Sequence, residues 1–373
     1  MSKPRLVILG IRGVPAAHGG FETFGEALAL YLVQRGWDVT VYCQASGDGL
    51  VHEDEWHGLR RVFVPVSGTG ALSTVAFDWK SVGLAARQHG ALALTLGYNT
   101  AIFCARLRLA KVPNIINMDG LEWQRVKWGP LPKLWLWVNE RAGCWLGNHL
   151  VADHPEIQRH LATRIDASKI TVIPYGAEQL TLVDESPLLA LGLQPGCYLT
   201  VIARPEPENS VLEIVQAFSA RPRGQMLVVL GKFASSGNAY HERVRQAASA
   251  EVKFVGAIYD PRVVQALRKH CTAYVHGHRV GGTNPSLVEA LGAGNAVFAH
   301  NNRFNRWVAG EGAAYFDGLE PLQQLFDELL QSPARLAAMR QASVERFAQG
   351  LTWPHVLAQY ETLLRSWRPA VTS

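Results

Sequence analysis

The residues best suited to chemistry lie in one short segment, which reads VGGTNPSLVEALGAGNAV from Val280 to Val297. Its glycine pair, Gly281 and Gly282, precedes apolar residues at helical spacing. A glycine-rich turn that leads into a helix leaves backbone N–H groups unpaired, and the helix dipole adds partial positive charge there. The segment therefore predicts a site that holds a phosphate. The polar side chains that we place in it are Thr283, Asn284, Ser286 and one acid, Glu289.

Glu289 follows Ser286 by three residues, which places it about one turn into the predicted helix. From there a carboxylate can reach a sugar hydroxyl of a nucleotide whose phosphates lie at the helix start, so the pattern predicts a nucleotide diphosphate site. His276 and His278 stand just before the glycine pair. They could donate to a phosphate or a sugar, or be satisfied structural residues. Alternating side chains on an extended segment point to opposite faces, which argues against a metal held by both.

A second glycine-bearing loop, Gly10 to Gly20, follows the apolar run Leu6 to Leu9 and leads into an amphipathic helix. Its glycines do not have the G-x-G-x-x-G spacing, and the loop is too long for the tight turn of a dinucleotide site. An ordinary NAD site is therefore disfavoured. The loop can tolerate an anion, and the alternative role of its glycines is to form turns.

Short apolar runs alternate with helix-like segments over the whole chain and indicate the elements that position these loops. The predicted strands are residues 6–10, 38–43, 61–65, 91–96, 114–118 and 149–152 in the first half, and 198–203, 226–230, 252–255, 273–275 and 296–299 in the second. Each half indicates a doubly wound parallel sheet of the α/β class. We place the boundary in the loop from Ile173 to Gly176, which gives domains 1–175 and 176–352. Both glycine loops would open on a cleft between the domains.

Composition excludes several classes of protein. With 373 residues, 48% hydrophobic and 18% charged, the chain can bury two cores. Its five cysteines are scattered without C-x-x-C pairs, which favours reduced thiols. No apolar run reaches the length of a membrane span, and no N-terminal segment has the pattern of a signal peptide. Together these features favour a cytoplasmic protein. A net charge of +5 is too small to argue for nucleic acid, and no recognition motif for one is present.

The stretch from Trp123 to Trp145 interleaves tryptophans with lysines and arginines. This mixture suits the surface of an anionic membrane. The alternative is a helix packed on the N-terminal core. We expect part of the stretch to be buried and part to form an exposed apolar ledge that meets a lipid-linked acceptor.

Four segments, taken in order along the chain, resemble the retaining glycosyltransferases of family 4, and within that family a rhamnosyltransferase-like branch. They are Gly10 to Thr23, Asp119 to Trp123, Ala203 to Asn209 and Gly281 to Ala290. The resemblance implies the GT-B fold, in which two Rossmann-like domains face a central cleft. It also implies that a C-terminal helix, residues 353–373, crosses back to the N-terminal domain.

The function that this resemblance implies is transfer of L-rhamnose from dTDP-L-rhamnose to a lipid-linked saccharide in polysaccharide biosynthesis, at the inner face of the cytoplasmic membrane. The donor is a co-substrate, and neither a cofactor nor a metal is implied, because cations and dipoles can stabilise the leaving diphosphate. The implied catalytic residues are Asp119, Arg204 and Glu289. The implied donor-binding residues are Gly19, Gly20, Lys232, His278, Gly281, Gly282, Thr283, Asn284, Ser286 and Glu289, and the implied acceptor-binding residues are Glu22, Glu122 and Trp123.

The chain departs from the family pattern at two donor positions. Gly281 stands where most members have the first of two glutamates, and Asn209 stands where a lysine is usual, so that Lys232 would have to supply the second positive charge. Asp119 stands where many relatives have a histidine, and Glu122 could instead pair with Arg125 on a solvated face. Two alternative functions remain: a non-catalytic nucleotide-sugar-binding subunit, and a GT-B nucleotide-sugar epimerase, which would need paired acids or histidines around the sugar.

Overall fold

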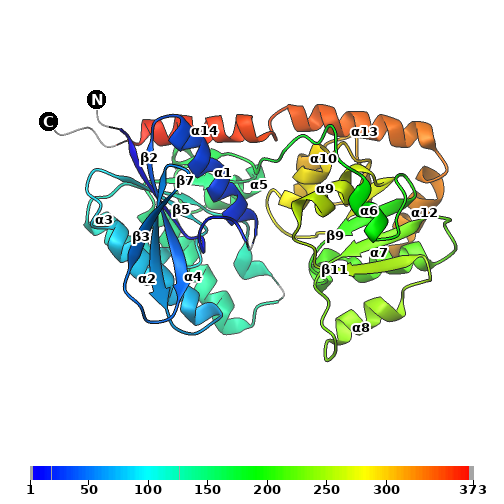
Figure 1. Cartoon of the computed structure of the whole chain (residues 1–373), viewed down its shortest axis with the longest axis horizontal. Helices are drawn as coiled ribbons and strands as arrows, with labels where there is room; N and C mark the ends of the chain where they lie inside the picture. The colour runs from blue at the N-terminus through cyan, green and yellow to red at the C-terminus, as the bar shows by residue number, and fades with distance from the viewer. Residues whose placement is uncertain (1–2, 18, 126, 369–373) are drawn as a thin grey trace. The chain divides into compact units, whose positions relative to one another are not determined.

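The computed structural model describes residues 3–17, 19–125 and 127–368, which fall into two compact units (Figure 1). The first unit is Met1–Pro174 together with Trp353–Ser373, and the second is Tyr175–Thr352. The first unit is therefore discontinuous in sequence.

The sheet of the first unit has the strand order β3-β4-β2-β1-β5-β6-β7-β8, with β1 (Arg5–Leu9) near its centre. Neighbouring strands are parallel, except that β3 pairs with β4 antiparallel. Leu6 to Leu9 are fully buried because helices cover both faces of the sheet. The other strands are β2 (Asp38–Ser46), β3 (His52–Trp56), β4 (Leu59–Val66), β5 (Leu92–Leu96), β6 (Asn114–Asn117), β7 (His149–Ala152) and β8 (Ile170–Val172).

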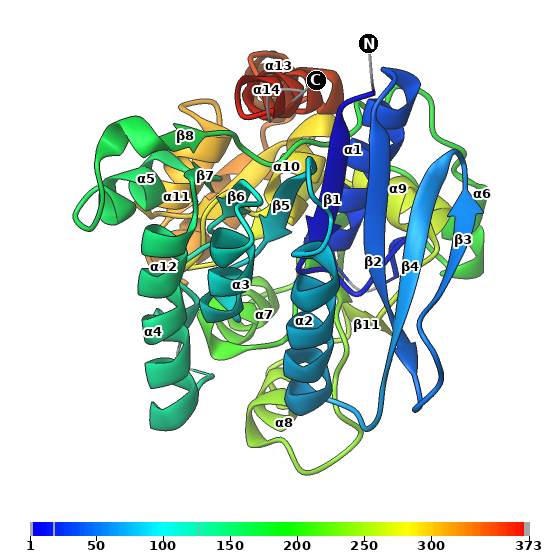
Figure 2. The same cartoon turned by 90° about the vertical axis from the view of Figure 1, so that its left-hand side faces the viewer.

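Helices α2 (Ala71–Ala85), α3 (Ala105–Leu109) and α4 (Pro130–Leu146) lie on one face of this sheet, and α1 (Gly20–Gln34) lies on the other (Figure 2). The unit also has three short 3₁₀ turns: η1 (Ala101–Cys104) precedes α3, η2 (Glu122–Gln124) follows β6, and η3 (Ala167–Lys169) precedes β8. Helix α5 (Pro155–Leu161) lies between β7 and η3. The last helix, α14 (Trp353–Ser366), returns to this unit and packs on α1. Phe24 and Tyr360 bring their ring centroids to 4.6 Å, and Asn117 Nδ2 donates to the Tyr360 hydroxyl at 2.7 Å. The predicted return of the C-terminal helix is confirmed.

The sheet of the second unit is parallel, in the order β11-β10-β9-β12-β13-β14. This is the doubly wound order in which the first strand, β9, lies beside the fourth, β12. The predicted α/β class with doubly wound sheets is therefore confirmed. The strands are β9 (Tyr198–Ile202), β10 (Met226–Leu230), β11 (Val252–Gly256), β12 (Ala273–His276), β13 (Val297–His300) and β14 (Ala314–Phe316).

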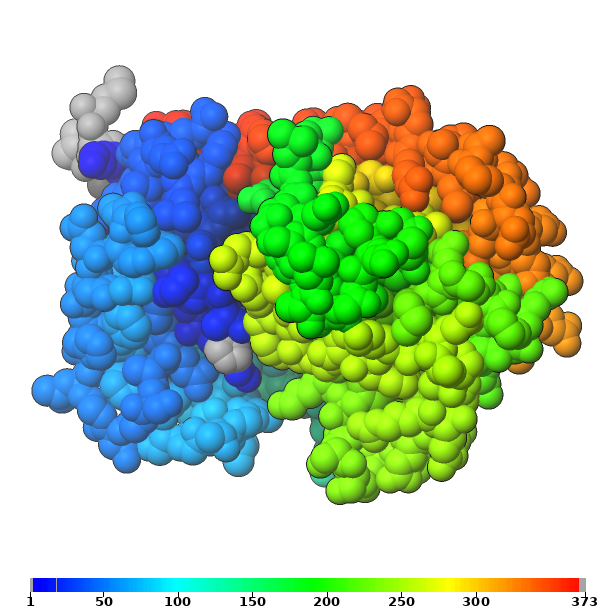
Figure 3. Space-filling view, turned by 45° about the vertical axis from the view of Figure 1, so that its right-hand side comes forward, coloured from blue at the N-terminus to red at the C-terminus, as the bar shows by residue number. Residues whose placement is uncertain are grey.

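Two layers of helices bury this second sheet. One core joins the sheet to α7 (Val211–Ser219), α8 (Ala239–Gln246) and α12 (Leu319–Leu329), with the rings of Phe218 and Phe326 5.6 Å apart. Cores on the other face use α9 (Pro261–Lys269), α10 (Pro285–Gly292), α11 (Arg303–Ala309) and α13 (Pro333–Ala348). The short α6 (Ser186–Ala190) packs beside α9 at the surface (Figure 3), and the 3₁₀ turn η4 (Pro207–Asn209) precedes α7.

No helix in the part of the chain that the structure describes has both the length and the apolar composition needed to cross a membrane.

Candidate functional site

The site with the clearest geometry lies at the carboxyl ends of β9 and β12. In a doubly wound sheet the connections from these two strands leave in opposite directions, and the crevice between them is the usual place for a ligand. The two loops meet: the Arg279 N–H donates to the Glu208 carbonyl at 3.0 Å. A Cβ on Gly277 would lie 2.3 Å from the Asn209 carbonyl oxygen, so this approach requires glycine.

Helix α10 begins at this crevice. Asn284 is its N-cap, because the Asn284 side chain accepts a hydrogen bond from the Ser286 N–H at 3.0 Å. Gly281 has φ of +142°, and no described atom lies within 4 Å of a Cβ built there. Glycine is thus required by the backbone and not by crowding. Thr283 is buried, whereas Gly281 and Gly282 are partly exposed, so the start of α10 can be reached by a ligand.

A buried arginine, Arg268 of α9, holds the polar side chains of the first turns of α10. It forms an ion pair with Glu289 and approaches Ser286 Oγ at 3.4 Å. Ser286 Oγ also bonds the Tyr274 hydroxyl. The side chain of Arg268 is 8% exposed and that of Glu289 is 33% exposed, so the carboxylate is fixed but remains accessible. Sequence reasoning missed Arg268, because PRVVQALRK gives no sign that the second of its two arginines packs beneath a neighbouring helix.

Two exposed cations follow the adjacent strands, Arg204 after β9 and Lys232 after β10. Asn209, for which the resemblance implies a lysine, is buried, and its amide donates to the Arg204 carbonyl at 2.8 Å. Asn209 therefore braces the loop that carries Arg204.

The two histidines that precede Gly281 lie face to face, with ring centroids 4.3 Å apart and an interplanar angle of 12°. The expectation that they point to opposite faces is wrong, because β12 ends at His276 and the following loop turns His278 back. His276 is fully buried, and burial with the neighbouring His278 and His300 holds its pKa well below the usual range. Neither of its ring nitrogens has a hydrogen-bond partner among the described residues. The His278 carbonyl accepts from Asn302 and Asn305.

Among the described residues, no group of three or more His, Cys, Asp or Glu side chains is arranged to hold a metal ion.

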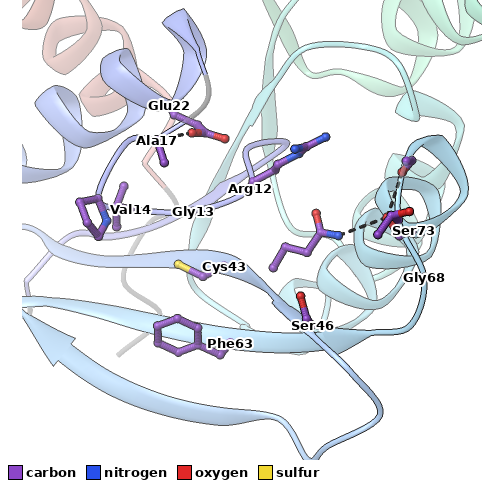
Figure 4. A pocket seen from close by; sticks show the side chains of 14 residues that line it. Arg12, Gly13, Val14, Ala17, Glu22, Cys43, Ser46, Phe63, Gly68 and Ser73 are labelled. Carbon is purple, nitrogen blue, oxygen red and sulfur yellow. Dashed lines mark hydrogen bonds between the residues drawn. The ribbon is translucent and has the colours of Figure 1, made fainter. Parts of the chain in front are cut away.

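In the first unit, the loop between β1 and α1 borders a cavity of about 380 Å³ (Figure 4). Gly19 is the N-cap of α1 and Gly20 is its first residue. Glu22 is 6% exposed, lines the cavity and accepts a hydrogen bond from the Ala17 N–H at 3.0 Å, so it also holds the loop. The cavity has the volume of a small-molecule site. Its lining residues are Arg12, Gly13, Val14, Pro15, Ala17, Glu22, Cys43, Gln44, Ser46, Phe63, Gly68, Thr69, Gly70 and Ser73.

The remaining candidates follow β6. Asp119 has φ of +50°, and its N–H donates to Asn117 Oδ1 at 2.9 Å. Burial, and then the negative charge of Glu122, raises the pKa of Asp119 to about 6. Glu122 Oε1 pairs with Arg125 Nε at 2.6 Å, so the alternative pairing is present, although both side chains are largely shielded from solvent.

Trp123 donates its indole N–H to Glu140 at 2.6 Å, and Glu140 is 1% exposed. The polar atom of Trp123 is thus used inside the unit, and only its ring can face an acceptor. The cavity beside Glu22 does not include Asp119, Glu122 or Trp123. The described candidates of the first unit therefore lie in two places, after β1 and after β6, with β5 between these strands in the sheet.

Comparisons with known proteins define the class of this fold. Residues 212–362 match the family described as "Glycosyl transferase-like", and residues 3–178 match "Domain of unknown function (DUF1972)". No curated protein matches the chain. The GT-B fold of glycosyltransferases is confirmed by solved structures that span almost the whole chain.

Three of these structures illustrate the likeness. Sucrose-phosphate synthase from Thermosynechococcus elongatus is 17% identical with a TM-score of 0.81, and the match covers 98% of this chain and 99% of that one. HepE of Anabaena in complex with UDP is 16% identical with a TM-score of 0.74, covering 97% and 100%. A UDP-forming α,α-trehalose-phosphate synthase from Burkholderia xenovorans, in complex with glucose-6-phosphate, is 12% identical with a TM-score of 0.73, covering 99% and 100%.

Proposed function

We propose that this chain is a glycosyltransferase that binds a nucleotide-sugar donor on its second unit and transfers the sugar to a saccharide acceptor. The observation that carries the proposal is the crevice between the adjacent strands β9 and β12, because the exposed Arg204 follows β9 and the start of α10 follows β12. Both features suit a diphosphate. Glu289, fixed by Arg268, is suited to a sugar hydroxyl. HepE, which has the same fold, binds UDP, and UDP with glucose in a second structure.

The chemistry required of such a site is stabilisation of the leaving diphosphate as its bond to the anomeric carbon breaks. Arg204, Lys232 and the N–H groups at the start of α10 would supply this stabilisation without a metal. Retention of configuration follows if the acceptor hydroxyl attacks from the face that the diphosphate leaves. The new bond then joins the acceptor oxygen to the anomeric carbon, and a diphosphate oxygen takes the hydroxyl proton. No enzymic nucleophile is needed.

In this proposal the donor is dTDP-L-rhamnose and the acceptor is a lipid-linked saccharide. Both rest on the resemblance of the four sequence segments to the rhamnosyltransferase-like branch. Asp119 would bind the acceptor hydroxyl, since a carboxyl group with a pKa of about 6 is mostly ionised at neutral pH and can accept a hydrogen bond from it. Glu22, Glu122 and the ring of Trp123 would contact the acceptor.

The test is turnover by the purified full chain with dTDP-L-rhamnose, UDP-glucose, UDP-galactose and GDP-mannose, each with a lipid-linked saccharide and with or without EDTA. Turnover with the dTDP donor alone, unchanged by EDTA and with the anomeric configuration retained, is the expected result. Turnover only with another donor would remove the rhamnose assignment. Nucleotide binding without turnover across acceptors would favour the binding-subunit function.

A matched pair of variants tests the site itself. Arg204→Gln should lower kcat/KM by about 10²-fold or more, because a positioned donor to the leaving group is lost. Arg159→Gln removes an arginine of α5 whose side chain is 69% exposed, and it should leave kcat/KM unchanged. Equal activity of both variants would contradict the assignment of Arg204.

A further inference from the structure

Helix α4 buries two polar side chains, Asn139 and Glu140, and leaves most of its large apolar side chains exposed. Asn139 and Glu140 are fully buried: Asn139 Oδ1 accepts from the Ile102 N–H at 3.0 Å, and Glu140 is paired with His160 and Arg164. A helix that only covers a core has the reverse arrangement. The apolar side chains that α4 leaves exposed are Leu131, Leu134, Trp135, Trp137, Val138 and Trp145.

The helices beside α4 lie on the same side of the sheet (Figure 2), and they also carry exposed apolar side chains. Trp79 of α2 is 49% exposed and lies edge-on to Phe103 of η1, with ring centroids 5.1 Å apart. The Trp135 indole N–H donates to the Asn99 carbonyl at 2.8 Å, which ties α4 to the segment before η1. Leu109, at the end of α3, is 85% exposed. We call the outward side of α2, η1, α3 and α4 the α2–α4 face.

The charge of this face has one sign. In residues 71–113 and 130–147, all of which the structure describes, the only acids are Asp78 and Glu140, and both are buried. Two of the cations lie over exposed tryptophans: Arg106 is 4.4 Å from the Trp79 ring centroid, and Arg141 is 3.3 Å from that of Trp137. The cations of these segments are Lys80, Arg87, Arg106, Arg108, Lys111, Lys133 and Arg141.

We propose that the α2–α4 face binds the surface of an anionic lipid bilayer. Tryptophan and leucine side chains enter the boundary between headgroups and acyl chains, while lysine and arginine remain with the negative headgroups. A symmetric contact with a second copy of the chain would bring cations against cations, so the charge pattern disfavours that occupant. The proposal does not depend on the reaction that the second unit performs, because its evidence lies entirely within the first unit.

The experiment is co-sedimentation of the full chain with vesicles of phosphatidylcholine alone and of phosphatidylcholine mixed with phosphatidylglycerol. The wild-type chain should bind the mixed vesicles and release from them as salt is raised. The double variant Leu131→Ser with Trp145→Ser should bind at least tenfold more weakly, since these two side chains are 79% and 65% exposed. Arg108→Glu should weaken binding to the mixed vesicles and not to phosphatidylcholine.

The matched control is Leu50→Ser with Leu182→Ser, which removes leucines that are 90% and 97% exposed but lie outside the α2–α4 face. This variant should bind as the wild type does. All variants should keep the wild-type melting temperature, because the altered side chains are exposed. The proposal is overturned if wild type does not bind mixed vesicles, or if the Leu131 and Trp145 variant binds as tightly. It is also overturned if the wild type is a dimer without lipid and that variant is a monomer, since the face would then join two copies.

Discussion

Arg268 connects α9 to the residues proposed to contact the donor. It is buried, pairs with Glu289 and approaches Ser286. Arg268 therefore fixes the positions of these two side chains of α10. Arg268→Lys keeps the positive charge, but the single ammonium group of lysine cannot contact Glu289 and Ser286 together as the planar guanidinium does. We expect the dissociation constant for the nucleoside diphosphate, measured by calorimetry, to rise about tenfold. Arg262→Lys, on the same helix but with a side chain 85% exposed, should leave it unchanged; equal effects would show that Arg268 does not position the site.

Because the pKa of Asp119 is raised in the native state, the stability of the chain should fall as pH rises. The native pKa is about 6 and the ordinary value is 3.8, so between these values the native state binds more protons than the unfolded state. The free energy of unfolding therefore falls as pH rises through this range, by up to roughly 3 kcal/mol. Asp119→Asn removes this pH dependence because the asparagine side chain does not titrate, and asparagine tolerates the positive φ. Denaturant unfolding should show the variant to be more stable at pH 8 and equal to wild type below pH 4. A variant that is less stable at pH 8 would contradict this account.

The residues of the candidate site that could be predicted are those with a local signal in the sequence. The polar residues at the start of α10 could be found because a glycine pair, an N-cap and an acid one turn later are local signals. Arg268 and Tyr274 could not be found, since they reach Ser286 from another helix and a strand. Trp123 gave a signal for ligand binding, but its indole N–H is bound to Glu140, seventeen positions away.

At the scale of elements, the loop after β1 passes so close to the end of β5 that its first residue must be glycine. Gly10 has φ of +85°, and a Cβ there would lie 2.2 Å from the Leu96 carbonyl oxygen. Gly10→Ala should therefore lower the free energy of unfolding by about 3 kcal/mol or more, since both strain and collision are added. Gly90 has a similar φ of +78° but no described atom within 4 Å of a built Cβ, so Gly90→Ala should cost only about 1 kcal/mol. Thermal or urea unfolding measures both, and equal losses would mean that the loop moves away from β5.

The elements that could be predicted are those with buried apolar runs, such as β1 and β10. The sequence did not predict β3, in which three of the five residues HEDEW are acids, because this edge strand pairs with β4 and buries almost nothing. The short β14 was also missed, because it has three residues, too few for a periodic pattern.

At the scale of the whole molecule, the first unit needs residues from both ends of the sequence. Tyr360 of α14 binds Asn117 and packs on Phe24. A chain that stops at Thr352 should lose the stability of the first unit, whereas Tyr175–Thr352 expressed alone should fold and bind the nucleoside diphosphate. Hydrogen exchange on the truncated chain checks this, with fast exchange expected in β1 and β6 and slow exchange in β9 and β12. Full protection of β6 without α14 would show that the helix is dispensable.

The discontinuity of the first unit also orders events during synthesis. A ribosome makes residues from the N-terminus onward, so the strands of the first unit leave it before those of the second. Yet the helix that covers Phe24 and Asn117 is made after every residue of Tyr175–Thr352. The whole sequence of the second unit is thus available before that of the first, and the first unit can be completed only after α14 has been made.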